Sequence, residues 1–275
     1  MPSGTALALK PCRHAPTDLT LTNAEREITA IMAPGNNPPR KVQATVVDLR
    51  SISHDVFRVE LALPDRSSLS FYAGQYLSVN LPDADPCYFS IASSPSEDHI
   101  ELQIQASPEW VSAQKVIDAL TSGRDVTVEL PHGKACLSAV PDKPVLLVAA
   151  GTGFAQMKSL VDYLRETDFD QPVKLFWGVR RQEDMYLRSL ARQWQSEWAP
   201  FTFIPVVGDD EDNDWSGHHD QLVRAVLASG ADWKHVEVHA SGSPAMVYAL
   251  MDALVEQGLP ERAFFSDVLE YAPRG

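Results

Sequence analysis

The stretch KPVLLVAAGTGFAQMK, residues 143–158, decides the fold. Its apolar run VLLVAA leads straight into Gly151-Thr152-Gly153 and then into a helical pattern. This order is typical of a buried parallel strand, a tight turn and a helix, whose first N–H groups attract an anion. Gly151 and Gly153 allow the backbone to approach a phosphate closely, and the Thr152 hydroxyl adds a donor. Taken alone, the junction fits either a nucleotide phosphate site or a simple chain reversal.

The chain after residue 141 repeats this strand–helix order. The runs VLLVAA, VKLFWGV, FTFIPVV and HVEVHAS each lead into a helical pattern, namely FAQMKSLVDYLRE, DMYLRSLARQWQSE, HDQLVRAVLAS and PAMVYALMDALVEQG. Such repeats predict a doubly wound parallel sheet with helices on both faces, which binds ligands at the carboxyl ends of its strands. Gly151, the Gly178-Val179-Arg180 turn and the Ser241-Gly242-Ser243-Pro244 turn all follow such strands. Their convergence favours the phosphate site.

The chain before residue 141 has a different texture. Short alternating or β-branched runs are separated by polar turns: VQATVVDL, VFRVELAL, YLSVNL, YFSIAS, HIELQIQA and DVTVEL. They predict a small antiparallel barrel or sandwich, interrupted by one helix at residues 111–121. Residues 1–39 contain six prolines and predict a partly disordered arm or linker. The expected domains are therefore 1–39, a β-barrel at 40–140 and a nucleotide-binding α/β domain at 141–275.

Composition excludes several classes of function. The 275 residues include 37 Asp and Glu against 23 Lys and Arg, a formal net charge of −14, which repels nucleic acid and anionic membranes. Three cysteines are too few for a disulfide framework, a four-cysteine zinc site or a four-thiolate iron–sulfur cluster. Redox chemistry would therefore need an organic cofactor. No stretch reaches the ~18 apolar residues of a membrane span, and we expect a cytoplasmic protein without a membrane partner.

Six short motifs in a fixed order resemble the ferredoxin–NADP reductase superfamily over roughly residues 40–270. Within it, the chain is most similar to NAD(P)H:flavin oxidoreductases and to the reductase components of bacterial oxygenases. The motifs are YFSIAS (88–93), LPHG (130–133), AGTGF (150–154), FWGVR (176–180), SGSPAM (241–246) and FFSD (264–267).

The resemblance implies a flavin, either retained FAD or FMN or riboflavin used as a substrate, together with NADH or NADPH. It places the segment of Tyr88, Phe89, Ser90 and Ile91 against the isoalloxazine, with the Ser90 hydroxyl as the catalytic group near N5. A neutral hydrogen-bonding group there can follow a change in protonation without leaving a buried charge. The alternative for Ser90 is a barrel serine that points to solvent.

The resemblance also implies roles in the second domain and in the cleft. Gly151, Thr152 and Gly153 would hold the dinucleotide pyrophosphate, while Gly178 and Arg180 would approach its adenosine end. Ser241 and Gly242 would lie beside the nicotinamide, His132 and Gly133 would line the flavin cleft, and Tyr271 would stack on the flavin. Three of these residues have a purely structural alternative that stays open. Arg180 could instead form an ion pair with Glu183 or Asp184. His132 could be a hydrogen-bonded structural residue, and Tyr271 could serve only to pack the C-terminal tail.

One position departs from the family. Cys87 stands where the flavin motif begins with a phosphate-binding arginine, and a small neutral thiol cannot replace bidentate charged contacts. Lys115 and Arg124 are candidate substitutes. The glycine-rich turn that cradles the FAD pyrophosphate is also missing from ASPEWVSAQKV (106–116). These losses favour either a loosely held flavin substrate or a degenerate protein. A catalytic thiolate is not expected, because Asp83 and Asp85 would raise the pKa of Cys87.

Two further features predict no metal site. The acidic run at residues 209–214 lacks the glycine and glutamate spacing of a calcium loop, and adjacent His218 and His219 point apart on any regular element.

Taken together, the motifs and their order predict an NAD(P)H-dependent flavin oxidoreductase. Its alternatives are an FAD-retaining reductase that serves a separate oxygenase, iron–sulfur or haem protein, and a non-catalytic interaction protein with weak flavin binding. The choice between NADH and NADPH stays open.

Overall fold

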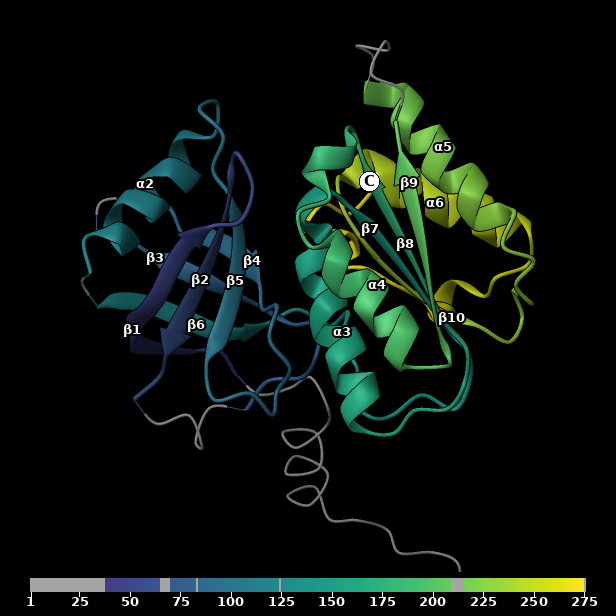
Figure 1. Cartoon of the computed structure of the whole chain (residues 1–275), viewed down its shortest axis with the longest axis horizontal. Coiled ribbons are helices and arrows are strands. Elements are labelled where there is room, and N and C mark those ends of the chain that lie inside the picture. The colour runs from purple at the N-terminus through teal and green to yellow at the C-terminus, as the bar shows by residue number, and fades with distance from the viewer. Residues whose placement is uncertain (1–37, 65–69, 83, 124, 209–214, 275) are drawn as a thin grey trace, which may run out of the picture.

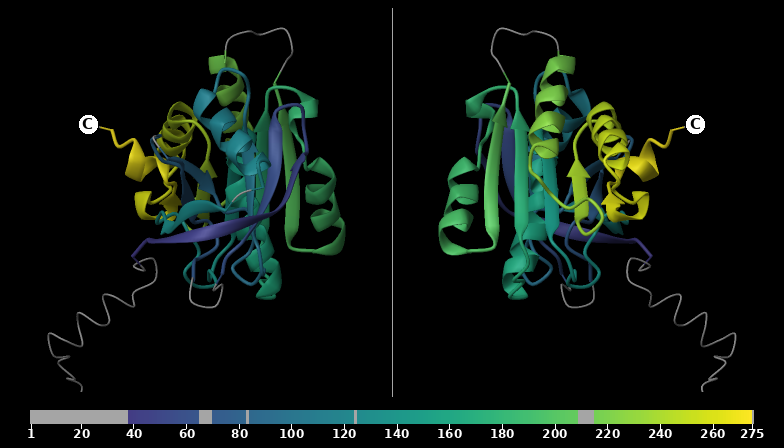
Figure 2. Two further views of the ribbon diagram at one scale, coloured as in Figure 1. Left: turned by 90° about the vertical axis from the view of Figure 1, so that its left-hand side faces the viewer. Right: turned by 90° about the vertical axis from the view of Figure 1, so that its right-hand side faces the viewer.

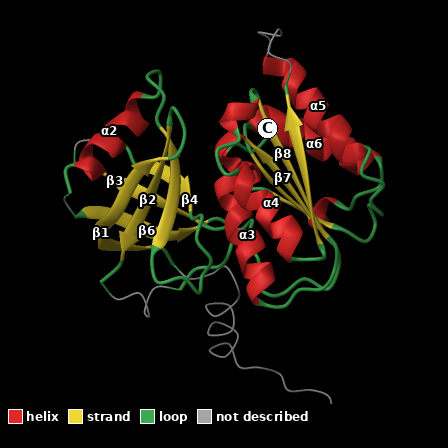
Figure 3. Cartoon of the chain, viewed as in Figure 1, coloured by secondary structure: helices red, strands yellow, loops and turns green. Residues whose placement is uncertain are grey.

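The computed structural model describes residues 38–64, 70–82, 84–123, 125–208 and 215–274, with no side-chain description at 215–219. Two β-sheet units lie side by side, an N-terminal barrel and a C-terminal sheet flanked by helices (Figure 1). Figure 3 shows the same division by element type, with strands dominating the first unit and helices surrounding the second. The predicted arm at residues 1–39 falls almost wholly outside the described residues, as does the acidic run at 209–214.

The barrel is a six-stranded antiparallel sheet in the order β4-β3-β6-β1-β2-β5. An isolated bridge between Ile91 and Leu102 joins the end of the first edge strand to the other edge, so the sheet nearly closes. Its strands are β1 (Arg40–Ser51), β2 (Val56–Ala62), β3 (Tyr76–Asn80), β4 (Cys87–Ser90), β5 (Ile100–Gln105) and β6 (Val126–His132).

Alternation along each strand builds the barrel core. In β2, Val59 and Leu61 are fully buried, while Arg58 and Glu60, which alternate with them, stay partly exposed, as the two-residue side-chain period requires. Helix α2 (Val111–Thr121) adds a buried stripe at Ala113, Val116, Ile117 and Leu120, the spacing of one helix face. This helix has the bounds that the sequence predicted.

The second sheet is parallel throughout, in the order β11-β10-β7-β8-β9. Helices cover both of its faces, so the central strand β7 is buried on both sides and reads as an unbroken apolar run. Its strands are β7 (Val145–Ala150), β8 (Val173–Val179), β9 (Phe201–Val207), β10 (Glu237–Ser241) and β11 (Phe264–Phe265). Its helices are α3 (Phe154–Glu166), α4 (Arg188–Glu197), α5 (Trp215–Leu227), α6 (Pro244–Glu256) and the short α7 (Val268–Tyr271).

The winding of this sheet reverses at β7. From β7 the chain proceeds to β8 and β9 on one side and then returns to β10 on the other (Figure 2). The carboxyl ends of β7 and β10 therefore meet at a switch point, the place where open α/β sheets bind ligands. The Gly151–Gly153 turn and Ser241 lie at these two ends.

The fold class predicted from the sequence is confirmed, with two differences in detail. Helix α4 begins at Arg188 and not at residue 184, because Arg181 N–H donates to Asp184 Oδ2 at 2.9 Å and closes a separate 3₁₀ turn. Strand β11 has only two residues, too few to show an alternating pattern. Among the described residues, no helix is long and apolar enough to cross a membrane.

Candidate active site

A cavity of about 730 Å³ lies between the barrel and the carboxyl end of the parallel sheet. Its volume is in the range of ~300–1,000 Å³ that is usual for ligand sites. The barrel contributes Tyr76, Tyr88, Phe89, Ser90 and His132, and the second unit contributes Gln156, Ser241, Gly242, Ser266, Asp267, Val268 and Tyr271. Because both units supply walls, two ligands held one on each unit would meet in this space.

Aromatic rings form the barrel side of the cavity. Tyr76 stacks on His132 with ring centroids 5.5 Å apart, and Tyr88 meets both rings edge-on at 5.8 Å. Tyr88 nevertheless leaves 59% of its surface exposed. The Nε2 atom of His132 is buried without a hydrogen-bond partner among the described residues. This wall therefore offers apolar ring faces and one unused ring nitrogen, both of which suit a flat heteroaromatic ligand.

Ser90 lies on the same wall. It ends strand β4 and is paired in register with Tyr76 on β3, which fixes its position beside the aromatic group. The short strand places Phe89 and Tyr88 along the cavity as well. The structure thus places Ser90 at the cavity wall, and its role toward a ligand stays a prediction.

The Gly151–Gly153 turn follows the carboxyl end of β7 and lies against Ser241, a residue of the cavity wall. Gly151 has a φ of +55°, a conformation that L side chains rarely adopt, and Trp177 Nε1 donates to its carbonyl at 2.9 Å. A Cβ on Gly153 would lie 2.3 Å from the Ser241 carbonyl oxygen, so only glycine lets the turn pack against the end of β10. The two strand ends at the switch point are therefore in direct contact.

Asp267 is a cavity-lining residue whose pKa is strongly raised. It accepts from Gln156 Nε2 at 2.9 Å and from the Ala135 N–H at 3.4 Å. Burial raises the pKa of its carboxyl to about 7, and Glu270 adds to this effect. Hydrogen bonds from the Ala135 backbone, the Gln156 side chain and the Lys134 backbone oppose it. Near neutral pH the cavity therefore contains a carboxyl group that changes charge readily.

Sequence reasoning did not assign Tyr76, Gln156 or Asp267 to the site. Gln156 carried a signal, since a single amide in the apolar turn FAQM must find partners when the helix packs. Asp267 appeared only as the last letter of a family motif. Tyr76 opens an ordinary strand, and nothing in its local pattern separates it from a surface tyrosine.

The cavity brings together most of the residues that the sequence assigned to the flavin and nicotinamide. They are Tyr88, Phe89, Ser90, His132, Ser241, Gly242 and Tyr271. Gly133 lies just outside, with the Asp267 carboxylate and the Tyr76 ring against it. Ile91 does not line the cavity, because its side chain is fully buried in the barrel core and only its neighbours reach the wall.

The remaining predicted positions lie around the cavity. Gly178 packs against Leu222 at the end of β8, and Arg180 is exposed beyond it. It is Arg181 that pairs with Glu183, at 3.4 Å. The side chains of His218 and His219 lie outside the description, and among the described residues no three His, Cys, Asp or Glu side chains form a group that could hold a metal ion.

Cys87 lies at the start of β4, partly buried against the barrel core. Burial, and secondarily Asp85, raises the pKa of its thiol, which opposes thiolate chemistry. None of the described residues that line the cavity is a lysine or arginine. Lys115 is exposed on α2, and Arg124 lies outside the described residues. The cavity is therefore chemically suited to uncharged rings and not to phosphate groups.

These observations fit a flavin and a nicotinamide as neighbours. The aromatic barrel wall and the unpaired His132 nitrogen suit an isoalloxazine. On the other side, the small residues Ser241 and Gly242 line the cavity, and the Gly151–Gly153 turn beside them leads into the N-terminus of α3, which attracts an anion. The Thr152 hydroxyl in that turn is a further donor.

Comparisons with known proteins agree with this geometry. Residues 43–136 match the model of an oxidoreductase FAD-binding domain, and residues 147–252 match that of an oxidoreductase NAD-binding domain. Reductase component 2 of terephthalate 1,2-dioxygenase from Comamonas is 32% identical over 222 residues, which are 80% of this chain and 66% of that protein. The NAD(P)H-flavin reductase of Aliivibrio fischeri is 29% identical over 84% of this chain and 99% of its own length.

Solved structures give the same result. The cytochrome P450 reductase GcoB of Amycolatopsis superposes with a TM-score of 0.70 and 28% identity, covering 84% of this chain and 70% of that one. A ferredoxin reductase of carbazole 1,9a-dioxygenase shares the fold with a TM-score of 0.68. The chain thus belongs to the ferredoxin–NADP reductase superfamily, as an oxidoreductase whose FAD-binding barrel precedes an NAD-binding α/β unit.

Proposed function

We propose that this protein is an NAD(P)H-dependent flavin oxidoreductase. The observation that carries the proposal is the shared cavity, in which Ser90 of the barrel and Ser241-Gly242 of the parallel sheet line one space. The overall reaction would convert NAD(P)H, a proton and an oxidised flavin into NAD(P)⁺ and a reduced flavin. When bound, the two cofactors supply the redox chemistry, since nicotinamide is a hydride donor and flavin N5 a hydride acceptor.

The contribution of the chain would be alignment and a suitable environment. Tyr88 and Tyr271, which are 59% and 60% exposed, offer ring faces to a flat ligand from opposite units. Ser90 would hydrogen-bond the reacting edge of the flavin, and His132 Nε2 would gain the partner that it lacks. Small residues at Ser241 and Gly242 would let the two rings approach to near contact.

The pyrophosphate of the nicotinamide dinucleotide would bind at Gly151, Thr152 and Gly153. This turn precedes α3, whose N-terminus adds a partial positive charge. Gly178 and Arg180 at the neighbouring strand end would lie toward the adenosine. The domain division that we propose follows the same logic, with an arm at residues 1–39, a flavin-binding barrel at 40–140 and a dinucleotide-binding unit at 141–275.

We further propose that the flavin is a loosely held substrate. Cys87 supplies no charge for a flavin phosphate, and the described cavity lining contains no cation that could substitute for it. The similarity to the terephthalate dioxygenase reductase favours a second possibility, in which FAD stays bound and electrons pass to a separate redox protein. This chain covers only 66% of that relative, so such a partner would have to be sought by experiment.

The third possibility is a degenerate interaction protein without catalytic activity. It is disfavoured because residues of both units still line one cavity and because Ser90 is at its wall. A cytoplasmic location remains part of the proposal, because NAD(P)H is the reductant that the fold is built to bind.

The deciding experiment is a visible spectrum of the purified protein, followed by NADH and NADPH oxidation with and without riboflavin, FMN and FAD. Colourless protein that oxidises NAD(P)H only with added flavin would support the flavin reductase. Yellow protein with a flavin spectrum would support the FAD-retaining reductase. Colourless protein that is inactive with every flavin and both reductants would overturn the proposed function.

A further inference from the structure

We propose that Lys158 is a positioning residue for hydride transfer, because it ties the Ser90 segment of the barrel to the helix that begins at the dinucleotide turn. The inference rests on the proposed function, since it concerns how the two cofactor subsites are held in register. Lys158 itself does not line the cavity.

Lys158 spans the boundary between the two units. It lies in the second turn of α3, which begins at Phe154 directly after the glycine turn. Only 8% of the residue is exposed. Its Nζ donates to the Ala92 carbonyl of the barrel at 3.2 Å and to Asp162 of its own helix at 3.0 Å. Since Ala92 is two residues beyond Ser90, one ammonium group connects the catalytic segment to α3.

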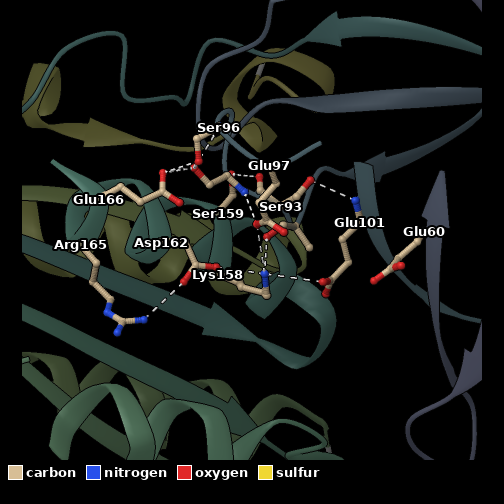
Figure 4. A network of polar contacts seen from close by, with 12 residues as sticks. Glu60, Ser93, Ser96, Glu97, Glu101, Lys158, Ser159, Asp162, Arg165 and Glu166 are labelled. Atoms are coloured by element: carbon tan, nitrogen blue, oxygen red, sulfur yellow. Dashed lines mark hydrogen bonds and ion pairs between the residues drawn. The ribbon is translucent and has the colours of Figure 1, made fainter. Parts of the chain in front are cut away.

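Carboxylates from both units surround this ammonium group (Figure 4). Glu101 of β5 approaches Nζ to 3.6 Å and Glu97 to 3.8 Å, on the barrel side, opposite Asp162 on the helix side. Burial disfavours the charge on Lys158, but these carboxylates together hold its pKa above the ordinary value. The group therefore stays charged, and it separates acidic side chains that would otherwise face one another across the boundary.

The barrel partner of Lys158 is itself fixed. Glu101 is 3% exposed, accepts from Arg58 Nη2 at 2.9 Å and from Gln103 Nε2 at 2.8 Å, and keeps a lowered pKa despite its burial. Gln103 in turn accepts from the buried Tyr186 hydroxyl at 2.8 Å. Lys158 thus connects to a hydrogen-bonded network on β2 and β5, which also reaches Tyr186 of the second unit.

Neighbouring side chains on α3 make neutral contacts across the same boundary. Ser159 Oγ donates to the Ser93 carbonyl at 2.8 Å, and Gln156 Nε2 donates to the Gly74 carbonyl at 2.7 Å. These bonds can keep the units together when Lys158 is replaced. Loss of the charge should therefore shift the Ser90 segment relative to the glycine turn without separating the units.

Such a shift should affect the chemical step more than binding. The flavin subsite is built mainly on the barrel and the dinucleotide subsite on the parallel sheet, so each retains its own contacts. A misplacement of about 1 Å between reacting groups can slow a reaction by about 10²-fold. We expect Lys158→Met to lower the hydride-transfer rate about 10- to 100-fold, with flavin Kd and NAD(P)H KM changed less than about threefold.

The test compares Lys158→Met with Lys158→Arg, which restores the charge, and with Lys174→Met as a matched control. Lys174 also donates to a backbone carbonyl, that of Ser229 at 2.9 Å, but within the second unit. Stopped-flow rates of flavin reduction are measured with NAD(P)H and with NAD(P)H deuterated at C4 of the nicotinamide. The isotope effect on these rates distinguishes a slower hydride-transfer step from a smaller fraction of active protein. We expect a slow, fully isotope-sensitive step in Lys158→Met, recovery to within about threefold in Lys158→Arg, and wild-type kinetics in the control.

Amide hydrogen exchange on the free protein provides a readout that does not depend on activity. In Lys158→Met, exchange in residues 90–96 should rise by at least about fivefold, while peptides from β7 and α6 keep their protection. Wild-type exchange in residues 90–96 would overturn the inference, as would equal impairment by methionine and arginine. If the wild-type protein oxidises no NAD(P)H with any flavin, the proposed function fails, and exchange alone still decides whether Lys158 couples the segments.

A second variant covers the case in which Lys158→Met does not fold. Glu101→Gln keeps the shape of the barrel-side partner and removes its charge. The same direction of change is expected in both the exchange of residues 90–96 and the hydride-transfer rate. Wild-type values for both in this variant would overturn the inference.

Discussion

Replacement of Asp267 by asparagine should change how the stability of the protein depends on pH. In Asp267, Oδ2 accepts from Gln156 Nε2 and Oδ1 accepts from the Ala135 N–H. Asparagine keeps only one of these two oxygens, so it loses one hydrogen bond at every pH, and it also loses the ability to ionise. The pH dependence of the difference between wild type and variant therefore isolates the titration of one group in the cavity.

The sign follows from the raised pKa. Between the ordinary value of 3.8 and the value of about 7 in the folded protein, folded Asp267 keeps a proton that the unfolded chain has lost. Wild-type stability should therefore fall as pH rises through this window and level off above it. The whole difference corresponds to about 4 kcal/mol at about 1.4 kcal/mol per pKa unit.

Of this loss of stability, about 3 kcal/mol occurs between about pH 5 and about pH 8.5. The rest occurs below about pH 5, where the carboxyl of the unfolded chain is still ionising. Part of the Asp267 carboxyl faces the cavity, where solvent weakens the effect. We therefore expect Asp267→Asn to gain about 2 kcal/mol relative to wild type between these pH values.

The assay is urea unfolding followed by tryptophan fluorescence at both pH values. Asp252→Asn serves as the control, because Asp252 is exposed and its pKa is lowered by the hydrogen bond from Arg274. Its loss should give no gain at high pH. Parallel pH dependence of wild type and Asp267→Asn would refute the reasoning and show that Asp267 ionises as an ordinary aspartate.

Three further substitutions test the proposed site. Ser90→Ala should lower kcat/KM for flavin-dependent NAD(P)H oxidation by about 10- to 100-fold with little change in flavin affinity, and an unchanged rate would remove Ser90 from the reaction. Gly153→Ala should weaken NAD(P)H binding at least about tenfold and lower the Tm, because the new Cβ would lie 2.3 Å from the Ser241 carbonyl oxygen. Gly230→Ala is its control, because Gly230 also has open space around a Cβ and a positive φ that costs about 1–2 kcal/mol, but it lies outside the proposed site. Equal loss of NAD(P)H affinity in Gly153→Ala and Gly230→Ala would contradict the steric argument. Cys87→Arg should tighten FMN and FAD by about tenfold but leave riboflavin, which has no phosphate, unchanged, as direct fluorescence titration will show.

Apart from β11 and the short α7, local pattern was sufficient to predict the elements and their order. Alternation in residues 42–49 and 56–63 predicted barrel strands, because a strand between core and solvent must alternate its side chains. The apolar run at 145–150 predicted a strand buried on both faces, and the turn after it was correctly placed at a strand end. The predicted start of α4 was wrong by four residues, because a short 3₁₀ turn at Gln182–Asp184 precedes the helix, which begins at Arg188.

The family resemblance also predicted part of the site. Ser90, His132 and Ser241 were assigned from motifs and Tyr271 from the C-terminal tail, and all four line one cavity. Their roles toward a flavin and a nicotinamide stay predictions for the variants above.

What only the tertiary structure decided is which distant segments meet. Asp267 has a raised pKa because packing of the C-terminal segment buries its carboxyl. The hydrogen bonds from Gln156 and the Ala135 backbone oppose this effect, and neither residue is near Asp267 in sequence. Lys158 looked like one polar position on an amphipathic helix, yet the packing of α3 on the barrel buries it among carboxylates of both units. The sequence determines periodicity and local propensity, whereas burial and the electrostatic environment of a side chain depend on what the folded chain places around it.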